Sequence, residues 1–105
     1  MGVICLRKTK HLRYIDVDWK HESRKYPSRL VSEIGGDDFE IRKLEFFPDG
    51  TVGFATEIQN SKTTELGADV IPSIEEINLK QEFSGKVISQ IDFEKLWEIY
   101  VLNGI

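Results

Sequence analysis

The chain has 105 residues, of which 40% are hydrophobic and 30% are charged, and its formal net charge is −4. This length suits one domain with one hydrophobic core, and this composition excludes intrinsic disorder. No apolar run reaches the roughly 18 residues of a membrane span, and the first residues lack the order of a signal peptide, so we expect a cytoplasmic protein.

The first strand is predicted directly after a basic N-terminal segment. Residues 1–12 mix a short apolar start with basic side chains, and we interpret them as an extension of a single domain at residues 13–105. Residues 13–21 predict a strand, because apolar and polar side chains alternate there with the two-residue period of a half-buried strand. We expect its apolar residues to face the core: Ile15, Val17 and Trp19.

Three further strands are predicted in the next part of the chain. Residues 29–34 alternate in the same way and end at a Gly-Gly-Asp-Asp turn. Residues 39–47 change the phase of their apolar side chains, which predicts a bulge near Arg42 and Lys43. A Pro-Asp-Gly turn then leads into a strand at residues 51–57, so the last two strands form a hairpin.

The C-terminal part predicts two helices, preceded by a short strand that fits residues 63–66. Ser73 and Glu76 have the spacing of a capping box, which predicts a helix from Ile74 to about Lys80. Ser89 is predicted to cap the start of a second helix in the same way, and an Asn-Gly pair is predicted to end it. The second helix has one apolar stripe, which consists of Phe93, Leu96, Trp97, Tyr100 and Val101.

These elements predict an α+β fold. Strands that are followed by helices favour an antiparallel sheet of about four to five strands, followed by two helices packed on one face. We expect the apolar stripe of the second helix to pack on the sheet face of Ile15, Val17 and Trp19.

The sequence shows no catalytic or metal-binding motif. His11 and His21 lie ten residues apart, too far along an extended strand to share an ion. Cys5 is the single cysteine, so one chain forms neither a disulfide nor a cysteine-based zinc site. Gly35 and Gly36 lack the helix and lysine that follow a phosphate-binding loop. We therefore expect no enzyme, no cofactor and no metal.

The charge is unevenly distributed along the chain. Residues 1–29 contain 8 Lys and Arg against 3 Asp and Glu, whereas the remainder contains 6 against 15. An acidic surface repels phosphate backbones and attracts basic partners. Carboxylates concentrate on adjacent strand and turn positions, and we predict that they bind the partner: Asp16, Asp18, Glu33, Asp37, Asp38 and Glu40.

Several tracts of the sequence carry a resemblance to a known family. They are YIDVDW at 14–19, SEI at 32–34, FEIRKLEFFPDG at 39–50, PSIEEIN at 72–78 and FEKLW at 93–97. Through them the chain resembles, from about residue 13 to residue 98, a family of small bacterial single-domain proteins of unknown function. The resemblance brings no catalytic residues. Small acidic bacterial domains of this kind are often immunity partners of secreted toxins, including toxins of contact-dependent growth inhibition.

The resemblance and the charge together predict a protein-binding domain that is not an enzyme. In this interpretation the chain is an immunity protein that neutralises a basic toxin domain by occluding its active surface. The alternative is a small regulatory module that contacts nucleic acid through the basic N-terminal segment, and an enzyme that uses the carboxylates ranks third. We expect no small-molecule substrate and no membrane partner, and we expect a protein rather than a nucleic acid.

Overall fold

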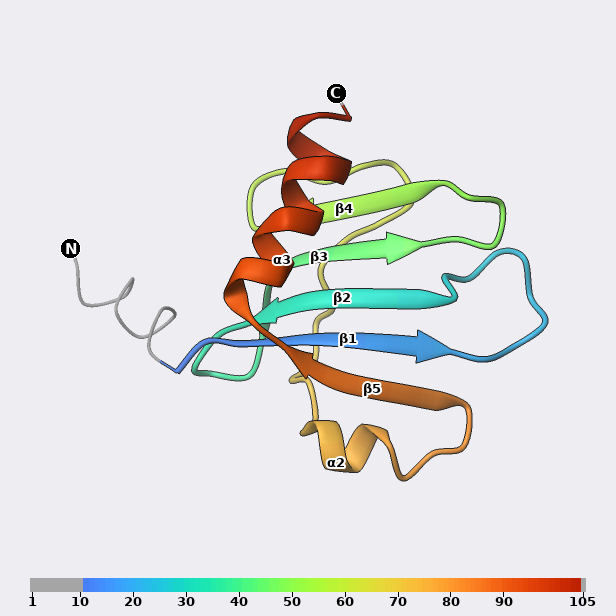
Figure 1. Ribbon diagram of the computed structural model, residues 1–105, viewed down its shortest axis with the longest axis vertical. Helices are drawn as coiled ribbons and strands as arrows, with labels where there is room; N and C mark the ends of the chain where they lie inside the picture. The colour runs from blue at the N-terminus through green and yellow to red at the C-terminus, as the bar shows by residue number, and fades with distance from the viewer. Residues whose placement is uncertain (1–10, 105) are drawn as a thin grey trace.

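Residues 11–104 are described by the computed structural model, in which five antiparallel strands form one sheet (Figure 1). Across the sheet the strands follow the order β4-β3-β2-β1-β5. Their bounds are β1 (Arg13–Trp19), β2 (Arg29–Ile34), β3 (Glu40–Phe46), β4 (Val52–Thr56) and β5 (Phe83–Ile88). The predicted α+β class and its antiparallel sheet are confirmed.

The phase change predicted in the third strand is a bulge in β3. Glu33 pairs with Arg42, whereas the next residue of β2, Ile34, pairs with Glu40, so Ile41 is the extra residue. The bulge therefore lies one residue before Arg42, close to the predicted position. It moves the apolar residues that follow it into the phase of the core.

The fifth strand lies at a position where no strand was predicted. β5 pairs with β1 along its whole length, whereas residues 63–66, predicted as a short strand, form a loop. Gly85 stands in the middle of β5, and a Cβ atom there would lie 2.6 Å from Cδ1 of Ile74. Because a neighbouring helix occupies the place of this side chain, the alternation that reveals a strand is absent from the sequence.

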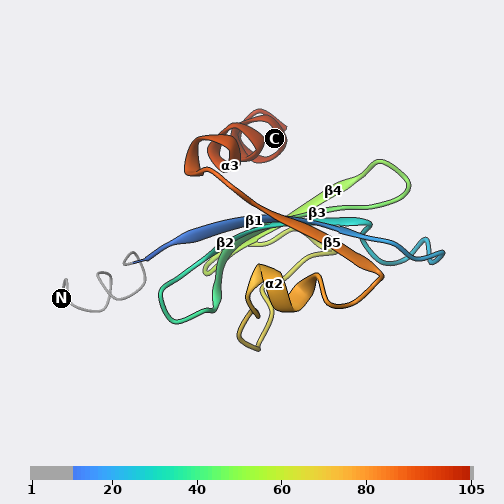
Figure 2. The same cartoon turned by 60° about the horizontal axis from the view of Figure 1, so that its bottom comes forward.

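The two predicted helices lie on opposite faces of the sheet, which corrects the expectation that both pack on one face (Figure 2). The short helix α2 (Ile74–Ile77) has the predicted capping box of Ser73 and Glu76. It ends earlier than expected, although turn hydrogen bonds continue to Lys80. It covers the face that carries Ile15 and Val17, together with Ile34.

The C-terminal helix covers the other face. It consists of α3 (Gln90–Trp97) and a π-helical continuation, η1 (Glu98–Leu102), and Ser89 caps it as predicted. Its stripe packs on Tyr14 of β1, and the core of this face consists of Tyr14, Val31, Leu44, Phe93, Trp97 and Val101. The expected contact with Ile15, Val17 and Trp19 is wrong, because these three residues belong to the opposite face of β1, whereas Tyr14 belongs to the core beneath the C-terminal helix.

The chain itself covers parts of both outer edges of the sheet. At β4, the amide of Phe54 donates to Ser61 Oγ at 3.0 Å, and the amide of Ser61 donates back to Phe54 O at 2.9 Å. At β5, the side-chain amide of Asn78 donates to Gly85 O at 3.0 Å and accepts from the amide of Gly85 at 2.7 Å. The backbone groups of Phe54 and Gly85 are therefore already satisfied.

Two further expectations concern the N-terminal extension and membrane-spanning helices. Most of the predicted extension at residues 1–12, including Cys5, lies outside the described residues. Between residues 11 and 104, no helix has the length and apolar character that crossing a membrane requires.

Candidate functional site

The six carboxylates predicted to bind a partner do not form one surface. The register places Asp16, Asp18 and Glu33 on the sheet face of α3. Glu40 lies on the opposite face, where it accepts a hydrogen bond from Ser32. The remaining two, Asp37 and Asp38, lie in the turn between β2 and β3.

Asp16 is buried and paired with an arginine of the neighbouring strand. Arg29 donates to both carboxylate oxygens of Asp16, at 2.9 and 2.8 Å, and this contact raises the pKa of the Arg29 guanidinium. The guanidinium lies 4.6 Å from the ring centroid of Phe46, which Tyr100 meets edge-on at 5.1 Å. The charge of Asp16 is thus neutralised within the fold.

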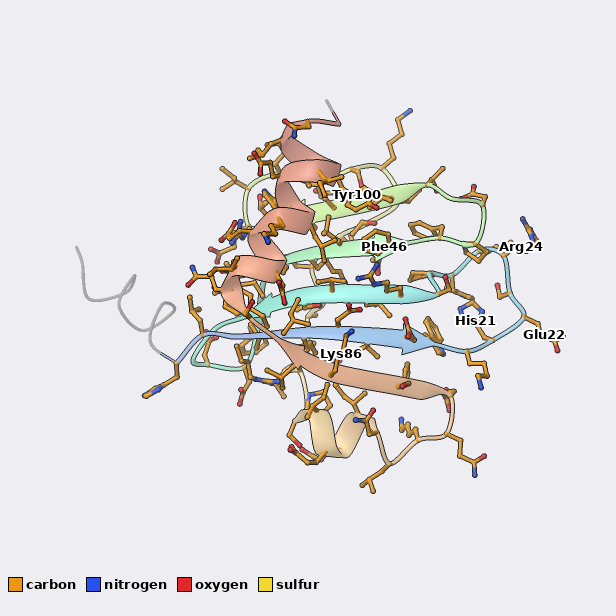
Figure 3. All side chains as sticks on the ribbon, viewed as in Figure 1. His21, Glu22, Arg24, Phe46, Lys86 and Tyr100 are labelled. Carbon is orange, nitrogen blue, oxygen red and sulfur yellow. The ribbon has the colours of Figure 1, made fainter. Side chains whose placement is uncertain are left out.

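A shallow hollow of about 440 Å³ lies beside this pair, on the same face of the sheet as α3. Its lining includes the exposed Asp18, together with Arg29 and Lys86. Figure 3 shows Lys86 and Phe46 on the sheet beside the C-terminal helix, and Tyr100 of η1 next to Phe46. Acidic and basic groups alternate here, so the hollow carries no dominant charge.

Glu33 has a structural environment. Arg42 donates to its two oxygens at 2.6 and 3.1 Å, and the hydroxyl of Tyr14 donates to it at 2.9 Å. Burial and this bond to Glu33 raise the pKa of Tyr14 to about 12. Arg42 also donates to Glu94 of α3, so this group of side chains ties the helix to the sheet.

Glu40 is likewise engaged within the fold. It accepts hydrogen bonds from the Ser32 hydroxyl at 3.1 Å and from the amide of Gly67 at 2.8 Å. Nζ of Lys43 lies 3.2 Å from the same carboxylate and 3.6 Å from that of Glu45. A buried carboxylate with these partners anchors the loop at Gly67 to the sheet.

The turn at Asp37 and Asp38 is joined to a distant part of the chain. Asp38 has a φ of 69°, and its carbonyl accepts a hydrogen bond of 2.8 Å from the amide of Ile71. Nη2 of Arg13 donates to Ile71 O at 2.7 Å and lies 3.5 Å from the Asp38 carboxylate. Asp37 accepts from the amide of Phe39, so it also serves the turn. These bonds bring the turn next to the start of α2.

This junction borders a second hollow, of about 430 Å³, which we call the acidic hollow. Its lining residues are Arg13, Asp38, Val70, Ile71, Pro72, Ser73, Ile74, Glu75, Glu76 and Val87. This set contains one guanidinium and three carboxylates, of which that of Glu76 also bonds to Ser73 in the capping box. Two of its apolar side chains are well exposed, Val70 by 56% and Val87 by 65%.

The sequence did not reveal this grouping. Glu76 is recognisable from the sequence as a capping residue, but nothing near it along the chain indicates its proximity to Asp38. The two segments are held together by Arg13 and by the bond between Ile71 and Asp38. Of the predicted carboxylates, Asp38 is the one that lines the acidic hollow, and its side chain is 60% exposed.

The described residues do not gather the side chains that a metal ion needs. Between residues 11 and 104, no three or more His, Cys, Asp or Glu side chains are arranged to hold an ion. Both ring nitrogens of His21 have partners: Nδ1 accepts from the amide of Ser23 at 3.1 Å, and Nε2 lies 2.8 Å from Pro27 O. His21 therefore fixes the loop between β1 and β2.

Comparison with known proteins identifies a family. Residues 13–102 match the family described as Domain of unknown function (DUF6881). No curated protein and no solved structure matches the chain. The match extends from β1 to the end of η1 and includes all lining residues of both hollows, and it confirms the expected resemblance to a family of unknown function.

Proposed function

We propose a non-enzymatic, protein-binding role for this chain, which belongs to the DUF6881 family of domains of unknown function. In this proposal it is an immunity-type protein. It binds a basic toxin domain and occludes the surface through which that domain acts, and it performs no chemistry of its own.

The observation that supports this role is the composition of the acidic hollow. Asp38, Glu75 and Glu76 surround a cavity that also exposes Val70 and Val87. Carboxylates steer a basic partner and fix its orientation, while exposed apolar side chains supply contact area that loses water on binding. Both properties occur at one place here.

We centre the proposed contact on Asp38, Glu75 and Glu76 rather than on several of the carboxylates predicted from the sequence. Asp16, Glu33 and Glu40 are paired within the fold with Arg29, Arg42 and Lys43, respectively. An incoming basic side chain gains little from a buried carboxylate that is already neutralised. Asp38 also has a cation nearby, Arg13 at 3.5 Å, but its side chain is 60% exposed and is therefore accessible to a partner.

The alternative is nucleic-acid binding through the basic N-terminal segment, in which residues 1–10 lie outside the described part of the chain and Arg24 and Lys25 are exposed. The described arginines that line the sheet give it less support. Arg13 donates to carbonyls of its own chain, and Arg29 and Arg42 donate to carboxylates. These guanidinium groups are therefore occupied rather than presented to a phosphate backbone.

The test is an affinity measurement on the partner recovered by pull-down from the native host. The variant Asp38→Asn with Glu75→Gln removes two charges from the acidic hollow, and asparagine tolerates the positive φ of residue 38. We expect binding at least about tenfold weaker, equivalent to 1.4 kcal/mol, with unchanged melting.

The matched control removes two exposed carboxylates elsewhere, as Glu22→Gln with Glu98→Gln. We expect the control to bind like the parent chain. Equal affinity of all three proteins, together with affinity of the parent chain that does not depend on salt, would refute an acidic contact surface.

A further inference from the structure

We infer that an apolar groove next to the acidic hollow receives one bulky apolar side chain of the partner, carried on a basic segment. This inference rests on the proposed protein-binding role and specifies how the partner is recognised. The occupant is a leucine-sized or aromatic side chain with lysine or arginine neighbours.

The groove lies on the sheet face of α2 and has a volume of about 290 Å³. It exists because two short segments, α2 and the loop that contains Gly67, cover this face and leave a gap between them. α2 has four residues and lies at the β5 side of the sheet (Figure 2). The amide of Gly67 donates to Glu40 and so anchors the loop to β3. The apolar lining between them consists of Ile15, Val17, Leu30, Ile71, Ile77 and Phe83.

The polar groups of the groove indicate an apolar occupant. Ser32 and Glu40 line it, but they bond to each other at 3.1 Å, and Glu40 has further partners in Gly67 and Lys43. They therefore offer no unsatisfied group to orient a polar ligand. Small-molecule sites typically begin at about 300 Å³ and add such orienting groups, so a single side chain fits this groove better.

The surroundings of the groove specify the neighbours of that side chain. Ile71, Pro72 and Glu76 line both the groove and the acidic hollow, so the two cavities are contiguous. A side chain seated in the groove thus places its flanking residues near Asp38 and Glu75. Lys80 lies at the groove as well and adds one positive charge beside Glu76. An anchor in a dry pocket with charged groups around it is a common arrangement of strong contacts at interfaces.

The probe is a synthetic peptide, acetyl-Lys-Lys-Trp-Lys-Lys-amide, titrated into the isotope-labelled full chain and followed by NMR chemical shifts. Two further peptides serve as comparisons, one with glycine in place of tryptophan and one with glutamate in place of every lysine. We expect the tryptophan peptide to shift the signals of Leu30, Ile77 and Phe83. We expect the other two peptides to bind at least fivefold more weakly.

A groove-filling variant provides the second measurement. Leu30→Trp places an aromatic ring in the groove and should reduce peptide affinity at least fivefold, whereas Ile58→Trp adds the same ring at a fully exposed position and should not. If Leu30→Trp fails to fold, the shifts in the unmodified chain decide the question.

The outcomes separate the groove from the acidic surface. Equal affinity for the glycine and tryptophan peptides, or shifts confined to the α3 face, would overturn the groove while leaving the acidic contact intact. If the peptide binds in the groove with an affinity that changes neither with salt concentration nor in the Asp38→Asn, Glu75→Gln variant, the acidic contact would instead be overturned. Absence of any shift with the tryptophan peptide overturns the inference as well.

Discussion

Arg42 connects the C-terminal helix to the sheet, and substitution of Arg42 is the clearest test of how this helix is held in place. Its guanidinium pairs with the buried Glu33 and with Glu94, and it lies 4.8 Å from the ring centroid of Phe93 and 5.0 Å from that of Trp97. These pairings with Glu33 and Glu94 raise the pKa of Arg42 despite its burial. Arg42→Met retains most of the aliphatic volume and removes the charge.

The expected loss follows from what Arg42→Met leaves behind. Removing one partner of a buried ion pair costs about 3 to 5 kcal/mol, because the other charge stays buried without compensation. Glu33 is in this position, since its side chain is 8% exposed. Glu94 is 45% exposed, so its share is smaller, about 0.2 to 1 kcal/mol. We expect a total near the range for Glu33 alone, a large part of a typical domain stability of about 5 to 15 kcal/mol.

A second substitution distinguishes lost charge compensation from lost packing. Glu33→Gln in the Arg42→Met background removes the uncompensated charge and still offers an amide oxygen to the hydroxyl of Tyr14. We expect the double variant to recover at least about half of the loss in urea unfolding followed by tryptophan fluorescence. A loss below about 1 kcal/mol for Arg42→Met, or no recovery in the double variant, would refute this account of the ion pair.

Three further predictions concern the core and the chain ends. Trp97→Ala should cost about 3 to 5 kcal/mol in chemical denaturation, because this ring is buried beside Phe54 and Phe93; a loss below about 1 kcal/mol would contradict its core position. Tyr14 has a pKa raised to about 12, so its contribution to stability is complete below pH ~10 and is lost as the pH rises through 12. Absorbance titration should show one tyrosine that ionises near pH 12, and Tyr14→Phe should abolish that step; its persistence would argue against the assignment. Deletion of residues 1–10 should preserve cooperative melting, since β1 already has a neighbouring strand on each side. Melting without a cooperative transition would show that the sheet needs this segment.

The sequence was sufficient for features that depend on neighbouring residues. The capping box of Ser73 and Glu76, and the Ser89 cap, each lie within four residues of chain, and both are present. The hairpin of β3 and β4 depends on a turn of similar length. The geometry of helix caps and tight turns is determined by the types of a few neighbouring residues, so the sequence predicts it directly.

Features that depend on contacts between distant segments were not predictable. Tyr14 alternates along β1 with Ile15 and shares its phase with Asp16 and Asp18, so the alternation does not show that this face of β1 is also buried against a helix. Gly85 concealed β5, because the side chain that fills its position belongs to Ile74.

The pairing of the predicted carboxylates was not predictable for a related reason. Asp16 and Glu33 look like free carboxylates along the chain, yet the register places Arg29 and Arg42 within hydrogen-bonding reach of them. The number of charges can be counted from a sequence, but which charges pair depends on the strand register of the folded sheet. Asp38 lies near Glu75 and Glu76 because of hydrogen bonds between distant segments, which no local sequence pattern indicates.

The covered edges of the sheet restrict how any partner can associate with this domain. Asn78 supplies at Gly85 the donor and acceptor that a sixth strand would supply, and Ser61 does the same at Phe54. A guest peptide that tried to extend the sheet would have to break these contacts before forming its own. Addition of a strand, and the edge-to-edge aggregation that exposed strand edges permit, are disfavoured at these two positions. In the proposed binding role, a partner at these positions would therefore contact side chains rather than strand backbone.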